Sequence, residues 1–166
     1  MLLASGVALA ATFVGTDGDD TFVGTDGPDD IRGLAGDDTL SGAGGRDRVR
    51  GDAGNDTLSG GPGGNLDQRE RVEGDGGNDT TSGEGGADEV RGGLGNDRML
   101  GGDGPDFVRA DDAGRDSVIA GSGNDVIDAH DDAGVDTIDC GDGTDTVDFD
   151  AGVDKVADNC ENKDPH

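Results

Sequence analysis

Aspartate residues recur at a nearly constant spacing along most of this chain, and each lies two residues after a glycine. There are 14 such Gly-x-Asp units, and the residue two positions beyond the aspartate is apolar in 13 of them, Thr81 being the exception. Carboxylates are the oxygen ligands that hard cations such as Ca²⁺ prefer. The pattern therefore predicts cation binding, repeated many times along one chain.

The spacing defines a nine-residue repeat, and it places the units in register. Windows such as GTDGDDTFV (15–23) and GDAGNDTLS (51–59) share Gly at position 1, Gly at position 4, Asp at position 6 and an apolar residue at position 8. The repeat is regular over 15–59 and 74–109 and looser over 110–157, where small insertions lengthen some steps. A fixed short period indicates a stacked repeat architecture.

Each repeat contains one short strand and one tight turn. Position 8 is the apolar member of a three-residue segment, so alternation turns it inward while positions 7 and 9 face outward. The glycines of positions 1 to 4 permit the positive φ that a tight turn requires. We therefore expect an all-β fold, a parallel β-roll (β-solenoid) with two repeats per coil and coils stacked about 4.8 Å apart.

Stacking brings the aspartates of alternate repeats together. Asp20, Asp38 and Asp56 should form one column, and Asp29 and Asp47 the opposite one. Carboxylates about 5 Å apart repel by roughly 3 kcal/mol per pair at an effective dielectric constant near 20. A Ca²⁺ ion between neighbouring turns removes this repulsion, because it accepts six to eight oxygens and each turn offers a carboxylate and several backbone carbonyls.

These windows resemble the RTX, or haemolysin-type, calcium-binding repeat G-G-x-G-x-D-x-U-x. The resemblance implies a parallel β-roll that folds outside the cell, with Ca²⁺ held in the turns by the position-6 aspartates and by backbone carbonyls. Carried over by position, the metal ligands are Asp20, Asp29, Asp38, Asp47, Asp56, Asp79, Asp88, Asp97 and Asp106, followed in the looser repeats by Asp116, Asp125, Asp136, Asp145 and Asp154. For any single aspartate, the alternative is a solvated turn residue that bonds its own backbone.

Several features depart from the repeat. Segment 60–73 is five residues too long and has Glu70 where aspartate belongs, so we expect a bulged coil with a solvent loop and no standard site. Thr81 is a poor inward residue and a possible weak point. Beyond residue 109 we expect irregular or low-affinity turns, because position 1 holds Asp111, Ala120, Asp131, Cys140 and Phe149 in place of glycine. We expect exposed or only indirectly supporting roles for the position-3 residues Asp17, Asp26, Asp103 and Asp142.

Composition restricts the possible partners. The chain has 35 glycines, four phenylalanines, no tryptophan or tyrosine, and a net charge of −27, which on composition alone is typical of disordered proteins. Its 12 basic residues are scattered among 39 acidic ones, which argues against nucleic acid and anionic membranes as partners. We expect the arginines to be outward, solvated residues. His130 and His166 have no zinc-ligand partner at a motif spacing.

The two ends of the chain carry further signals. Residues 1–11 are apolar and end in an A-x-A pattern, which predicts a truncated Sec signal peptide; a short strand capping the first coil is the alternative. Cys140 and Cys160 flank the last repeats, and we favour a disulfide over two free thiols in an exported protein. We interpret 158–166 as a C-terminal cap or tail.

Three classes of function fit these observations. The first is a secreted calcium-binding protein made of blocks 12–59, 74–109 and 110–157, which folds on binding Ca²⁺ with an affinity on the order of 10⁻⁴ to 10⁻³ M per site. The second is a calcium-dependent secretion or folding module of a larger exoprotein, and the third is a surface-adhesion module whose protein or polysaccharide partner is unknown. An enzyme is least expected, because the chain has no H-E-x-x-H or G-x-S-x-G motif.

Overall fold

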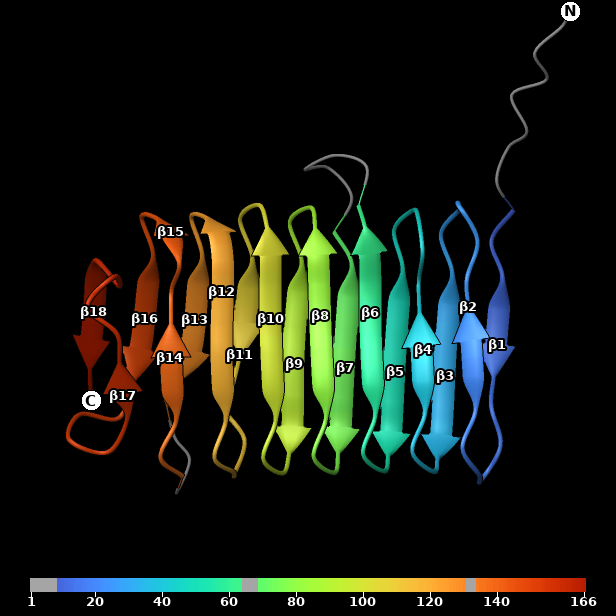
Figure 1. Cartoon of the computed structure of the whole chain (residues 1–166), viewed down its shortest axis with the longest axis horizontal. Helices are drawn as coiled ribbons and strands as arrows, with labels where there is room; N and C mark the ends of the chain where they lie inside the picture. Colours follow the sequence, from blue (N-terminus) through green and yellow to red (C-terminus); the bar gives the residue numbers. More distant parts are fainter. Residues whose placement is uncertain (1–8, 64–68, 131–133) are drawn as a thin grey trace, which may run out of the picture.

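The computed structural model describes residues 9–63, 69–130 and 134–166, and these form strands and turns with no helix. Two parallel sheets lie face to face in a long, flat spiral, with β1 and β18 at opposite ends (Figure 1). The first sheet contains β1 (Thr12–Val14), β3 (Asp30–Ala35), β5 (Arg48–Ala53), β7 (Arg71–Gly76), β9 (Glu89–Leu94), β11 (Phe107–Arg109), β13 (Val126–Ala129), β16 (Thr146–Phe149) and β18 (Asn162–Pro165). The second contains β2 (Thr21–Val23), β4 (Thr39–Ser41), β6 (Thr57–Pro62), β8 (Thr80–Gly85), β10 (Arg98–Asp103), β12 (Ser117–Gly123), β14 (Thr137–Asp139), β15 (Asp142–Gly143) and β17 (Lys155–Val156).

Successive strands alternate between the sheets through most of the chain, so two repeats complete one coil. Thr12 pairs with Asp30, and Asp30 pairs with Arg48, both in parallel register. The β-roll with two nine-residue repeats per coil is therefore confirmed. The register follows from the repeat, because a shift by one residue would turn every apolar position-8 side chain outward.

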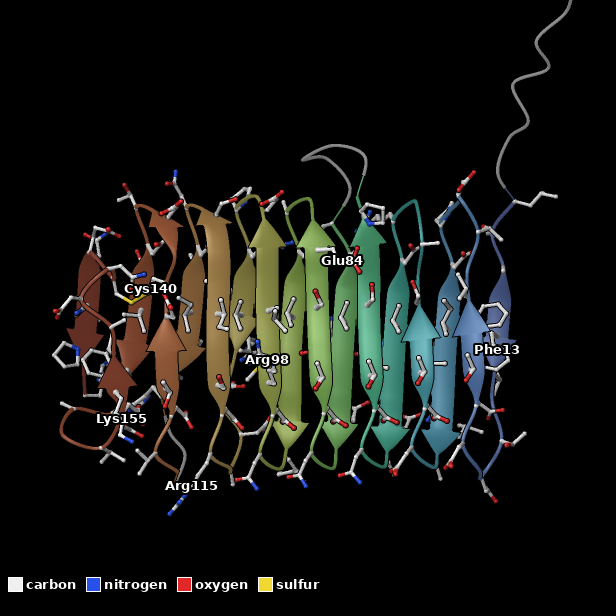
Figure 2. All side chains as sticks on the ribbon, in the orientation of Figure 1. Phe13, Glu84, Arg98, Arg115, Cys140 and Lys155 are labelled. Atoms are coloured by element: carbon white, nitrogen blue, oxygen red, sulfur yellow. A yellow bond between two sulfur atoms is a disulfide. The ribbon has the colours of Figure 1, made fainter. Side chains whose placement is uncertain are left out.

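The core between the sheets consists of stacked position-8 side chains, joined in the C-terminal part by alanines and the two cysteines (Figure 2). One buried cluster consists of Ile31, Leu40, Val49, Leu58 and Val72. A second cluster begins at Val90 and runs to the last coils. Thr81 lies between the two clusters, fully buried, and its Oγ1 atom has no hydrogen-bond partner. The predicted weak point of the array is thus the break in its apolar core.

Replacing Thr81 with valine should stabilise the folded array. Valine has nearly the same shape, and the change removes a buried hydroxyl that makes no hydrogen bond, which should add about 1 kcal/mol to the free energy of unfolding. Urea unfolding in saturating Ca²⁺ would measure the gain. Thr80→Val, on the outward side of the same strand, is the matched control and should change the stability little. A destabilised Thr81→Val protein would show that the hydroxyl is satisfied in solution.

Beyond residue 109, the residues found at position 1 are not all those that the sequence predicted. Ala110 and Ala129 occupy inward positions and are buried, as are Ala120 and Cys140. Phe149 takes the same position in β16, paired with Ala129. The assignment of position 1 to Asp111 was wrong. This repeat is one residue longer than nine, and the extra residue lies in the turn between Ala110 and Asp116, so Ala110 takes the inward position. Asp131 lies outside the described residues. The methyl groups of these alanines join the second core cluster.

The two ends of the core are closed differently. The rings of Phe13 and Phe22 stack at the N-terminal end, with centroids 4.2 Å apart. At the other end the Cys140–Cys160 disulfide is present, with a Cα–Cα distance of 5.2 Å. The segment interpreted as a tail contains β18, which pairs with β16 and extends the first sheet.

Segment 1–11 falls mostly outside the described residues. Of its last three residues, Leu9 accepts a hydrogen bond from Thr25 Oγ1, and the Ala11 N–H donates to the Asp29 carboxylate. These contacts join the segment to the first coils. Among the described residues, no helix has the length and apolar character needed to cross a membrane.

The outer faces of the two sheets differ in chemistry. The first sheet carries an arginine face, in which guanidinium groups pair with acidic side chains; Arg50 Nη2 lies 2.8 Å from Asp75 Oδ2, and Arg91 Nη2 lies 2.7 Å from Asp112 Oδ2. The arginine face consists of Arg32, Arg48, Arg50, Arg71, Arg91 and Arg109. The second sheet carries a hydroxyl face, which consists of Thr21, Thr39, Thr57, Thr80, Ser41, Ser59 and Ser82, aligned in register from β2 to β8.

Candidate metal centre

The position-6 carboxylates form two columns, one along each edge of the spiral. The first column precedes the strands of the second sheet and consists of Asp20, Asp38, Asp56, Asp79, Asp97, Asp116, Asp136 and Asp154. The second column precedes the strands of the first sheet and contains Asp29, Asp47, Asp88, Asp106, Asp125 and Asp145. All 14 aspartates predicted from the sequence lie in these columns. They alternate between the columns except at Asp56 and Asp79, which both belong to the first column.

A hydrogen-bonded ladder holds each column together. Over most of each column, the backbone N–H of an aspartate donates to Oδ1 of the aspartate in the next coil, as from Asp38 to Asp56 at 2.8 Å and from Asp88 to Asp106 at 2.8 Å. One oxygen of the accepting carboxylate is thereby fixed by the backbone of the preceding coil. This bond orients the carboxylate and leaves its second oxygen available.

The second oxygen is buried and makes no hydrogen bond over most of the array. Oδ2 has no partner in nine aspartates of the columns: Asp38, Asp47, Asp56, Asp79, Asp88, Asp97, Asp106, Asp125 and Asp145. A buried polar atom without a partner costs on the order of 1–3 kcal/mol, and more where the group is charged. Free carboxylate oxygens repeated in this way are donors that a hard cation such as Ca²⁺ could use.

In the regular repeats, the position-1 glycine leaves open the space that the free oxygen faces. A Cβ atom on Gly74 would lie 2.3 Å from Asp79 Oδ2 and 2.4 Å from the carbonyl oxygen of Gly92 in the next coil. On Gly42 it would lie 2.5 Å from Asp47 Oδ2 and 2.4 Å from the Gly60 carbonyl oxygen. A carboxylate oxygen and a carbonyl oxygen from two coils therefore converge where a side chain would otherwise stand.

Burial raises the pKa of several carboxylates in the middle of the columns above the ordinary aspartate value. The pKa of Asp106 rises to about 7, and burial outweighs the opposing effect of the hydrogen bond at the Asp88 backbone. The pKa rises to about 6 for the same reason in Asp47, Asp56, Asp79, Asp88, Asp97 and Asp125. Without a cation, the fold therefore disfavours the ionised form of these groups.

The aspartates at the ends of the columns are satisfied locally. Asp20 Oδ2 accepts a hydrogen bond from the Thr16 N–H at 2.6 Å, and Asp29 Oδ2 accepts one from the Thr25 N–H at 2.5 Å. Asp154 Oδ2 accepts one from the Asp150 N–H at 2.9 Å. These three resemble self-bonded turn residues more than the central members do.

Two glutamates that the sequence analysis did not assign as ligands complete the second column. Glu70 takes the place between Asp47 and Asp88, and its N–H donates to Asp88 Oδ1 at 3.2 Å. Glu161 ends the column, where its Oε2 accepts from the Asp145 N–H at 3.0 Å. The Arg-Val pair that follows Glu70 has the pattern of positions 7 and 8, and this signal could have identified Glu70. Glu161 lacks such a signal, because Lys163 stands where an apolar residue would mark the strand.

The fold brings the two histidines together, which their sequence spacing did not indicate. Their ring centroids are 4.4 Å apart, and His166 Nε2 lies 3.1 Å from Asp148 Oδ1. Within the parts of the chain that the structure describes, however, no three His, Cys, Asp or Glu side chains are arranged to hold a metal ion. Carbonyl oxygens beside the columns, such as that of Gly92 near Asp79, could contribute to the shell of a cation there. A ligand set of oxygens suits Ca²⁺ better than Zn²⁺.

Comparison with protein-family models agrees with this geometry. The RTX calcium-binding nonapeptide repeat matches residues 14–49, 33–66, 73–108, 110–135 and 129–156, which is more than half of the chain. The chain belongs to the RTX calcium-binding repeat family. No curated protein is matched in a sequence search. The family model also matches the loose repeats of this RTX chain, at 110–135 and 129–156, but it does not reach β18.

Proposed function

We propose that this RTX protein is a secreted, non-enzymatic calcium-binding protein whose β-roll forms when Ca²⁺ enters the carboxylate columns. The observation that carries the proposal is the row of buried Oδ2 atoms without a partner, several of which, such as those of Asp47 and Asp79, lie beside a carbonyl of the next coil. An ion there would satisfy both oxygens and join two coils. Folding and binding would then be one process, because neither the core layer nor the columns exist in the unfolded chain.

A calcium titration followed by far-UV circular dichroism tests this function. In EGTA at neutral pH the chain should lack strand signal, because the ionised columns repel and the core is one side chain thick. Millimolar Ca²⁺ should restore the signal steeply, and Mg²⁺ should not, since it demands a small octahedral shell and dehydrates reluctantly. An unchanged spectrum in Ca²⁺, or an equal response to Mg²⁺, would contradict the proposal.

Secretion is supported by two properties of the chain. The disulfide between Cys140 and Cys160 is typical of oxidising compartments. Weak calcium sites of extracellular modules work at the 10⁻⁴ to 10⁻³ M level, so the same chain would stay unfolded in a calcium-poor cytosol and fold after export.

A second candidate function is surface adhesion. It is favoured by the hydroxyl face, where Thr39 aligns with Thr57 and Thr57 with Thr80. The sequence analysis did not recognise these aligned rows of threonine and serine. A regular neutral face of this kind suits an extended polysaccharide, and the role would be added to calcium binding rather than replace it.

A further inference from the structure

Glu70 differs from every aspartate in the columns. Its side chain is fully buried, and neither Oε1 nor Oε2 has a hydrogen-bond partner. In the regular part of the array one carboxylate oxygen accepts the ladder bond and only the other is free, as in Asp88 and Asp106. Glu70 thus leaves two adjacent oxygens of one carboxylate unsatisfied in the interior.

The backbone around Glu70 is nevertheless regular. Its N–H donates to Asp88 Oδ1, and its carbonyl accepts from the Glu89 N–H at 3.0 Å. Val72 then enters the core in register with Val90. The backbone therefore keeps its place in the column, while the longer side chain leaves the ladder.

The two free oxygens face two carbonyls of the next coil. A Cβ atom on Gly60 would lie 2.1 Å from Glu70 Oε2 and 2.9 Å from the Gly83 carbonyl oxygen. On Gly63 it would lie 2.0 Å from the Gly85 carbonyl oxygen and 3.2 Å from Glu70 Oε1. Each free oxygen of Glu70 thus lies beside a glycine position that a carbonyl oxygen of the next coil also approaches.

Among the described residues, no basic group donates a hydrogen bond to this carboxylate. Four arginines line a nearby surface pocket beside Asp47, but the two Glu70 oxygens accept no hydrogen bond from them. The pocket arginines are Arg46, Arg48, Arg69 and Arg71. Burial raises the pKa of Glu70, and the negative charges of Asp88 and Asp47 raise it further. A buried carboxylate in such surroundings is protonated unless a cation offsets its charge, and its two unpaired oxygens offer such a cation a bidentate site.

We infer that Glu70 binds Ca²⁺ with both carboxylate oxygens and forms the tightest site of the array. This inference rests on the proposed function and replaces the expectation that segment 60–73 has no site. Bidentate coordination by a glutamate supplies two ligands from one side chain, whereas a central aspartate of the columns has one free carboxylate oxygen. The Glu70 site would fill first and dock the inserted coil between the two regular blocks.

Calorimetric titration of the full chain with Ca²⁺ tests the inference. Glu70→Gln should remove one bound ion and abolish the tightest binding step, so that the first detectable step moves at least about tenfold higher in Ca²⁺. Asp88→Asn should remove one weaker ion and leave the tightest step in place. Glu89→Gln, which changes an outward carboxylate of the next coil, is the matched control and should leave both the number and the tightest step unchanged.

The outcomes separate this inference from the proposed function. If the Glu70→Gln protein folds with Ca²⁺ and keeps the tightest binding step, the role of Glu70 is overturned. The proposed calcium binding by the columns would then still stand. A wild-type chain that binds no Ca²⁺ would overturn both. If the Glu70→Gln protein fails to fold, the Glu70→Asp variant provides the test. Its shorter carboxylate should accept the ladder hydrogen bond, and the protein should lose the tightest binding step. An unchanged tightest step would contradict the inference.

Discussion

Replacing Gly77 with alanine should break the array into two independently unfolding parts. Gly77 has φ of 143°, and a Cβ atom there would lie 1.6 Å from the Gly54 carbonyl oxygen in the preceding coil. That contact is with backbone, so no side chain can rotate away. Strain and overpacking together should cost on the order of 4 kcal/mol. Because each coil contacts only its neighbours, the loss falls on one interface in the middle of the roll.

Urea unfolding in saturating Ca²⁺ would show this as two transitions in place of one. Gly76→Ala is the matched control, because a Cβ atom on Gly76 would meet only the Asp52 carbonyl oxygen at 3.6 Å, an ordinary contact. Its stability should stay within about 0.5 kcal/mol of wild type. Equal losses at Gly76 and Gly77 would show that the coils are not stacked in this register.

Acid should partly replace calcium in folding the chain. Burial raises the pKa of Asp106 to about 7 and that of Asp79 and Asp97 to about 6, from an ordinary value near 3.8. A carboxylate whose pKa is raised by folding destabilises the fold when it is ionised in both states, above pH 7. The penalty disappears as the pH falls from 7 towards 4, because the folded state then binds protons that the unfolded state does not. The calcium-free chain should therefore gain strand structure over this range.

Circular dichroism in EGTA between pH 8 and pH 4 would measure the gain. Asp106→Asn should weaken the pH dependence and raise the stability of the calcium-free fold at pH 7.5, while the same change at Asp103, outside the columns, should do neither. With Ca²⁺ present the direction reverses, since protons compete with the ion for the same oxygens and affinity falls as the pH falls. Less strand signal at pH 5 than at pH 7.5 in EGTA would contradict this account.

The nine-residue period accounts for most of what the sequence could predict. It places the aspartate columns on opposite edges and an apolar residue such as Ile31 or Val90 inward, because a strand alternates strictly and parallel stacking repeats every coil. Thr81 was recognised as a departure for the same reason. These predictions need only local pattern and the rule that strands stack in register.

The remaining features depend on how the chain absorbs its insertions. Counting back from Asp116 places Asp111 at position 1, whereas the structure adds the extra residue to the turn and keeps Ala110 inward. Glu70 was missed as a ligand because a search for Gly-x-Asp cannot recognise a longer side chain after a longer turn. The contact between His130 and His166 arises from tertiary stacking, which no local pattern contains.

The alternation of strands between the two sheets restricts how such a chain can change its length. Deleting 18 consecutive residues from a regular block removes one whole coil, and every later strand keeps its sheet and its column. Deleting nine residues moves each later strand to the opposite sheet. The arginine face and the hydroxyl face would each end at the deletion, and the residues that continue them would lie on the other sheet. Evolution of this chain by duplication or loss should therefore have proceeded in steps of two repeats wherever the two outer faces matter.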